Sequence, residues 1–265
     1  MNPKHEEKQE KTRLNKFLSH NTKYSRREAD ELIKNGRVKI GQKVVVDMGY
    51  MIGGEDKVFV DGVFIKERKN ESTVIVYNKL KGELVTKKDP MGRKTIYDTL
   101  PDGFKHFVPI GRLDFASEGL LLLTDSPEIA SVLMHSDLQR MYKVKIKGNV
   151  TNSIKSAMES GIEIIGSKKG AHSESKIENI SFAPFVGFNI LKDSPTFSKL
   201  KVIIAEGLNR ELRRFFAHFD REVVDLKRLE FGGISLNNLP SGKWRFLSKN
   251  EYKSLHSFMK ENKNQ

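Results

Sequence analysis

The chain has 265 residues, no cysteine and a formal net charge of +13, and 37% of its residues are hydrophobic. This length and hydrophobic content are enough for about two domains with packed cores. The lack of cysteine excludes disulfides, thiolate metal sites and cysteine nucleophiles. No segment approaches the roughly 20 apolar residues of a membrane span. The excess of cations favours a polyanionic partner, so we expect a cytoplasmic protein that binds nucleic acid.

The first part of the chain predicts a charged lead, a small domain and a linker. Residues 1–11 are polar, which is typical of a disordered segment and not of a signal peptide. Residues 12–65 predict two short amphipathic helices followed by strands that form a small sheet. The second helix is expected to begin at a capping box made by Ser25 and Glu28. The polar residues 66–72 are expected to form the linker.

Residues 73–249 predict a second, larger domain in which strands outnumber helices. Strand-like runs recur along it, among them Val74–Tyr77, Gly119–Thr124 and Met141–Lys147. Because strands and helices do not alternate regularly, we expect a mixed, largely antiparallel α+β domain and not a doubly wound one. Residues 250–265 are expected to form a polar tail.

One carboxylate and one tyrosine are candidates for chemistry. Asp114 ends the run Gly111-Arg112-Leu113-Asp114, just before the apolar residues 120–123. No second acid is near enough in sequence to predict a metal pair, which favours a single catalytic aspartate, although a turn-capping aspartate is an alternative. Tyr142 lies on an alternating strand, where an ordinary half-buried strand tyrosine is the alternative.

A third candidate is a basic helix start. The chain breaks at Gly207 into a helix that Asn209 is expected to open, and this helix carries Arg210, Arg213 and Arg214. Cations repel one another, and the dipole at a helix N-terminus favours anions. A partner anion is therefore expected there, either a phosphate or a buried carboxylate such as Asp114.

Residues 12–65 resemble the alpha-L RNA-binding motif. The resemblance rests on the runs Arg13–Leu18, Ser25–Ala29 and Ile33–Val38. It implies RNA binding through cations near the helix starts, where side chains and backbone amides can meet phosphates together. The alternative is a helix pair with a solvated basic face. The residues implied in RNA binding are Arg13, Lys16, Arg26, Arg27 and Arg37.

In order and spacing, the three candidates resemble the pseudouridine synthase family named for the small-subunit rRNA enzyme A. The resemblance extends from Arg13 to Leu247, and the runs Gly82–Thr86 and Asp89-Pro90 are most similar to the large-subunit enzyme B branch. It implies that the catalytic residues are Asp114, Tyr142 and Arg213. The residues implied in substrate binding are Arg112, Asn209, Arg210 and Arg214.

This resemblance implies an enzyme that isomerises a specific uridine of ribosomal RNA, most similar to a large-subunit enzyme. The reaction needs one carboxylate and no metal or other cofactor. Ribosomal RNA, or a pre-ribosomal particle, is the expected partner of a monomeric protein, without DNA or membrane. The alternative is a non-catalytic rRNA-binding protein that acts in ribosome assembly or as an RNA chaperone. A metal-dependent nuclease would need clustered carboxylates, which the sequence does not offer.

Overall fold

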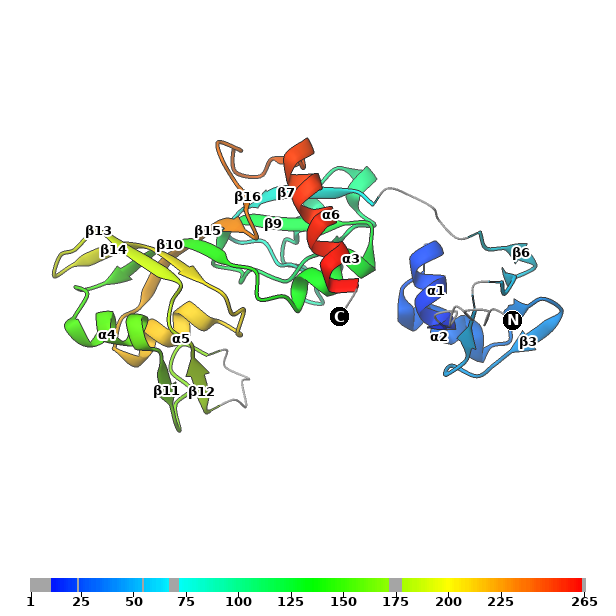
Figure 1. Cartoon of the computed structure of the whole chain (residues 1–265), viewed down its shortest axis with the longest axis horizontal. Helices are drawn as coiled ribbons and strands as arrows, with labels where there is room; N and C mark the ends of the chain where they lie inside the picture. The colour runs from blue at the N-terminus through cyan, green and yellow to red at the C-terminus, as the bar shows by residue number, and fades with distance from the viewer. Residues whose placement is uncertain (1–10, 23, 54, 67–71, 172–177, 264–265) are drawn as a thin grey trace, which may run out of the picture. The chain divides into compact units, whose positions relative to one another are not determined.

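The computed structural model describes residues 11–22, 24–53, 55–66, 72–171 and 178–263. It divides the chain into two compact units, Met1–Glu71 and Ser72–Gln265 (Figure 1). Residues 1–10 of the expected lead and 67–71 of the expected linker lie outside the described residues. No helix in the described part is long and apolar enough to cross a membrane.

The first unit packs two helices against short strands. The helices are α1 (Leu14–Asn21) and α2 (Arg26–Lys34), and the predicted capping box is present, since Ser25 and Glu28 bond each other's backbone amides. Their apolar faces bury Leu18 and Ile33 completely. The strands form a four-stranded sheet, in the order β3 (Lys43–Val45), β2 (Val38–Ile40), β5 (Val58–Val60) and β6 (Val63–Phe64), and a separate pair, β1 (Thr12–Arg13) with β4 (Met51–Ile52).

A nine-stranded sheet runs through the second unit. Its main path is β13 (Gly187–Lys192), β14 (Phe197–Ile204), β10 (Arg140–Lys147), β15 (Val223–Phe231), β9 (Glu118–Thr124), β7 (Val74–Lys79) and β17 (Trp244–Phe246). Two short strands pair off this path, β8 (Val108–Pro109) with β9 and β16 (Ile234–Ser235) with β15. Every pairing in this sheet is antiparallel except that of β15 with β9. The expected mixed, largely antiparallel α+β fold is confirmed.

Two hydrophobic cores cover different parts of this sheet. The helices α4 (Asn152–Ser160) and α5 (Glu211–His218) pack below β13, β14, β10 and β15 (Figure 1). The helices α3 (Pro127–Met134) and α6 (Lys249–Lys263) pack on β7 and β9. Both faces of β9 are buried, because its alternate leucines join the two cores, Leu121 and Leu123 the first and Leu120 and Leu122 the second.

The two halves of the sheet meet only at a short parallel junction. β15 pairs with β9 through Lys227 with Glu118 and Arg228 with Gly119. A Cβ on Gly119, which has φ +104°, would lie 2.3 Å from the carbonyl oxygen of Arg228, so this close approach requires glycine. N-terminal to the junction, β15 has no β9 partner. The chain segment just before Glu118, which contains Asp114, therefore lies at the point where the sheet divides.

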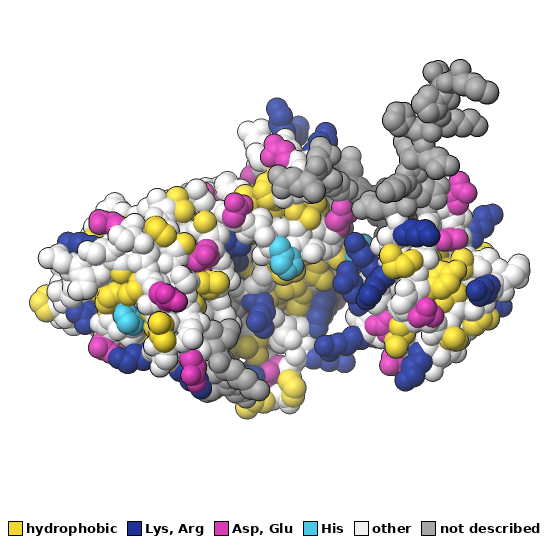
Figure 2. Space-filling model, turned by 60° about the horizontal axis from the view of Figure 1, so that its bottom comes forward, with side chains coloured by type: hydrophobic (Ala, Val, Ile, Leu, Met, Phe, Trp, Pro, Cys, Tyr) yellow, Lys and Arg dark blue, Asp and Glu magenta, His cyan; other side chains and the backbone are white. Residues whose placement is uncertain are grey.

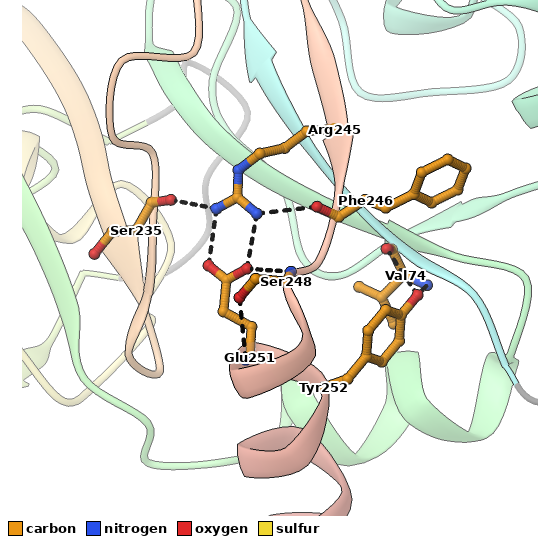
Figure 3. A network of polar contacts seen from close by, with 7 residues as sticks. All are labelled: Val74, Ser235, Arg245, Phe246, Ser248, Glu251 and Tyr252. Carbon is orange, nitrogen blue, oxygen red and sulfur yellow. Dashed lines mark hydrogen bonds and ion pairs between the residues drawn. The ribbon is translucent and has the colours of Figure 1, made fainter.

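Residues 250–265 were expected to form a polar tail, and this prediction is wrong for the described residues. They belong to α6, which buries Leu255 and Met259 against the second core. The helix start is tied down by Arg245, whose guanidinium donates to both carboxylate oxygens of Glu251 at 2.7 and 2.8 Å (Figure 3). The hydroxyl of Tyr252 accepts from the amide of Val74 at 3.0 Å. The helix is therefore part of the second unit.

Candidate active site

Asp114 lies in the loop between β8 and β9, and several bonds hold the backbone of this loop. The amide of Ser117 donates to the Asp114 carbonyl at 3.0 Å, and the amide of Gly82 donates to the Phe115 carbonyl at 2.8 Å. The Asp114 side chain is 31% exposed. A fixed backbone with a partly open carboxylate is the arrangement expected of a group that must meet a substrate in one geometry.

The ammonium of Lys79 is the main anchor of this loop. Its side chain is completely buried, and Nζ donates to the carbonyls of Leu80 at 2.9 Å, Asp114 at 3.2 Å and Ser117 at 2.9 Å. An ammonium has three donors, and each finds one carbonyl. Burial lowers the pKa of Lys79 from 10.5 to about 8, while Glu83, Asp114 and Glu118 act against this shift. The sequence interpretation missed this residue, and a lysine at the end of an otherwise buried strand was its only signal.

Two guanidiniums lie against the Asp114 carboxylate. Arg213 Nε is 3.3 Å from Asp114 Oδ2, and Arg210 Nη1 is 3.5 Å from the same oxygen. The Arg213 contact is an ion pair and not an aligned hydrogen bond. Arg213 also donates to the Val223 carbonyl at 3.0 Å and to Ser117 Oγ at 3.2 Å, so it joins α5, β15 and the Asp114 loop. Burial lowers the pKa of Arg213, and Asp114 opposes this shift.

The start of α5 differs from the sequence prediction, in which Asn209 opened this helix. The residue at the N-cap position is Arg210, in the left-handed region at φ +51°, and no side chain caps the helix there. Glu211 accepts from the amide of Leu208 at 3.0 Å instead. The left-handed conformation of Arg210 costs backbone energy. With the chain in this conformation, both Arg210 and Arg213 lie at Asp114.

Buried Arg140 holds the chain that leads into α5. Its Nη1 donates to the carbonyls of Leu138 at 2.9 Å and Ala205 at 2.7 Å, and burial lowers its pKa. Glu211 is also buried, and burial raises the pKa of this carboxyl to about 7. Buried charged groups therefore hold the chain segment that precedes Arg210 and Arg213.

The remaining candidates are not all brought to Asp114. Arg112 and Asn209 are exposed. Tyr142 is only 8% exposed and is part of the first core. Arg214 was expected to bind substrate, but it is 2% exposed and donates to the Ser167 carbonyl at 3.4 Å. A buried guanidinium bonded within the protein does not present its charge to an incoming phosphate, so the structure does not support this assignment, which stays a prediction.

In the first unit, the expected RNA-binding cations are on the surface. Arg13 is the N-cap of α1, and Arg26 begins α2. These two arginines, Lys16 and Arg27 are exposed. Arg37 is exposed too, but its guanidinium bonds both carboxylate oxygens of Asp61, which reduces the charge it presents to a phosphate. Among the side chains that the structure describes, no three His, Asp or Glu lie together where a metal ion would bind.

Comparison with known proteins agrees with this architecture. Residues 12–58 match the S4 domain, an RNA-binding domain, and residues 73–218 match the RNA pseudouridylate synthase family. A relative from Helicobacter pylori strain 26695, described as an uncharacterized RNA pseudouridine synthase, is 50% identical, covering 93% of this chain and 94% of its own. The ribosomal large subunit pseudouridine synthase B of Bacillus subtilis is 34% identical, covering 95% and 98%.

A solved structure shows the same fold. The crystal structure of a pseudouridylate synthase superposes with a TM-score of 0.63 at 26% identity, covering 92% of this chain and 99% of the other. The family match extends over more than half of the chain, and the relatives match nearly all of it. The chain is an isomerase that belongs to the RNA pseudouridylate synthase family.

Proposed function

We propose that the protein isomerises one uridine of large-subunit ribosomal RNA to pseudouridine, with Asp114 as the catalytic residue. The observation that carries the proposal is the Asp114 carboxylate at the division of the sheet, held by Arg210 and Arg213 from one side and by Lys79 through its backbone. The 34% identity with the large-subunit enzyme of Bacillus subtilis supports the choice of RNA.

The reaction requires few groups from the protein. The N1–C1′ bond of uridine breaks, the base turns, and C5 forms a new bond to C1′. N1 gains a proton and C5 loses one, so atoms balance without an added reactant. A carboxylate positioned at the sugar or the base acts as nucleophile or charge stabiliser. Asp114 is the carboxylate to which we assign this role, and the ion pairs with Arg210 and Arg213 orient it.

The other residues bind and position the RNA. We assign Tyr142 to the contact with the target base after the base is flipped from its neighbours, through the 8% of the residue that is exposed, and this contact offsets part of the cost of unstacking. Arg112 and Asn209, both exposed, contact the RNA near the target. The S4 domain binds the RNA through Arg13, Lys16, Arg26 and Arg27. The protein acts as a monomer in the cytoplasm, on RNA and not on DNA.

Release of tritium from rRNA labelled at uridine C5 tests this proposal. Isomerisation removes the C5 hydrogen, so the full-length protein should release tritium, whereas a protein that only binds rRNA should not. Separate incubations with large-subunit and small-subunit rRNA test the choice of substrate. Release from the small-subunit RNA alone would contradict the large-subunit assignment, and release from neither would contradict the rRNA substrate.

A further inference from the structure

The face of the sheet opposite α4 and α5 carries rows of lysine. Residues directly opposite each other on paired strands share a face, and two such rows cross β13, β14, β10 and β15. The first row is Asn189, Lys201, Lys143 and Lys227, and the second is Lys192, Lys199, Lys145 and Asp225. We call the six lysines of these rows the lysine face.

The lysine face is open and mostly unneutralised. Its lysines are exposed or half-exposed, and within the described residues no helix packs over them and none forms an ion pair within 4 Å. Asp225, an acid within the second row, is paired with Lys81, and Glu118 lies directly opposite Lys227 at the end of the first row. In the view of Figure 2, which brings the lower side of Figure 1 forward, acidic and basic side chains are interspersed over the left part of this unit.

This arrangement does not stabilise the fold. Four of the direct cross-strand pairs join two lysines, namely Lys143 with Lys201, Lys143 with Lys227, Lys145 with Lys199, and Lys192 with Lys199. Like charges directly opposite each other are destabilising. A surface needed only for solubility would mix signs, so these lysines indicate a bound polyanion.

The first row leads to the proposed active site. Lys227, at its end, pairs directly with Glu118 across the parallel junction, and Glu118 is four residues after Asp114. Strands lie about 4.8 Å apart, so the path from Lys201 through Lys143 and Lys227 to Glu118 spans about 14 Å. The first row therefore runs along the sheet to the start of β9, the strand that follows the Asp114 loop.

We propose that the lysine face binds the phosphate backbone of the RNA that flanks the target uridine, as a second RNA surface separate from the S4 domain. Lysine is a compact charge on a flexible stem, which suits phosphates of any sequence better than paired recognition of one base. The proposal depends on an RNA substrate for this enzyme but not on its being ribosomal. An acidic protein is the alternative partner for the lysine face, but the position of the first row beside the Asp114 loop gives no reason to expect it there.

The salt dependence of RNA binding tests the proposal. The variant carries Lys143→Gln, Lys201→Gln and Lys227→Gln, and the probe is a fluorescent 20-nucleotide oligouridylate bound to the full-length protein. Each lost phosphate contact should lower the slope of log Kd against log salt by about 0.7–0.9, so the slope should fall by about 2. At 0.15 M salt the affinity should fall about tenfold or more. The melting temperature should stay equal or rise, since repulsion between lysines is removed.

Two comparisons make the result specific. A matched triple variant of exposed α6 lysines, Lys249→Gln, Lys253→Gln and Lys260→Gln, removes the same charge and should keep the wild-type slope. The triple arginine variant of the same row keeps its charge and should keep the affinity. Equal slopes for both glutamine triples, or unchanged RNA affinity in the row variant, would overturn the proposal and leave the face to an acidic protein. This assay measures binding to an RNA that need not be the natural substrate. A negative result would therefore contradict the role of the lysine face without contradicting the proposed isomerisation, which tritium release tests.

Discussion

Replacing the buried Lys79 should separate the positioning of Asp114 from the stability of the fold. Lys79→Met removes three bonds from an ammonium to carbonyl groups, worth about 5–9 kcal/mol together. The lowering of its pKa from 10.5 to about 8 shows a burial penalty, and relief of that penalty returns about 3 kcal/mol. The variant should therefore lose about 2–6 kcal/mol of unfolding free energy.

The loss of activity should be larger than this stability change explains. Without Nζ, the carbonyls of Asp114 and Ser117 lose their shared donor and the loop can shift. A displacement of about 1 Å of a catalytic group costs about 100-fold in rate. We expect kcat in single-turnover assays at saturating RNA to fall about 100-fold at a temperature where the variant is folded. A folded variant with wild-type kcat would refute the reasoning.

The pH dependence gives an independent test of the same residue. As pH rises through about 8, buried Lys79 loses its proton, so activity should fall. Stability should change in the opposite direction, because the unfolded lysine holds its proton up to pH 10.5, and the unfolding free energy should rise between pH 8 and 10.5 by up to about 3 kcal/mol. The arginine of Lys79→Arg does not titrate in this range, so the activity of this variant should not fall near pH 8. A fall in its activity at the same pH as in the wild type would contradict the assignment.

Three further outcomes follow from the contacts around α5 and α6. Arg213→Ala should lower kcat by about 10–100-fold, and Arg210→Ala should lower it by less, because Arg213 also holds the Asp114 loop. Arg214→Ala should lower the melting temperature and leave kcat unchanged. Burial raises the pKa of Glu211 to about 7, so the unfolding free energy of the wild type should fall as pH rises from 4.5 to 7. In urea titrations, Glu211→Gln should remove about 1–3 kcal/mol of this fall. Arg245→Ala should lower the melting temperature by several degrees without changing the RNA affinity, since it breaks the bidentate pair at the start of α6.

Local signals in the sequence predicted local structure. The Ser25 capping box and the buried run at 120–123 depend on neighbouring residues, and both are present as predicted. The arginines of the basic helix start were expected to meet an anion such as Asp114, and Arg213 Nε lies 3.3 Å from Asp114 Oδ2. Their catalytic roles stay predictions.

Long-range packing produced what the sequence did not show. The burial of Lys79 depends on carbonyls 35 and 38 residues away. The junction of β15 with β9 joins residues more than 100 positions apart. The sequence of residues 250–265 is mostly polar, and among its described residues two buried side chains, Leu255 and Met259, attach α6 to the core. Two apolar residues were too weak a signal to predict a packed helix. Lysine alternation in β10 was visible, but only the strand register aligned it with lysines of β14 and β15.

Single-turnover tritium release by Asp114→Asn tests the central claim most directly. The amide keeps the shape of the side chain and removes the carboxylate, so isomerisation should fall below detection while RNA affinity stays within a few-fold of wild type. Asp102→Asn removes an exposed carboxylate of the same unit, whose partner is Lys105, and should keep wild-type turnover. Release at the wild-type rate by Asp114→Asn would contradict the assignment of this aspartate as the catalytic residue.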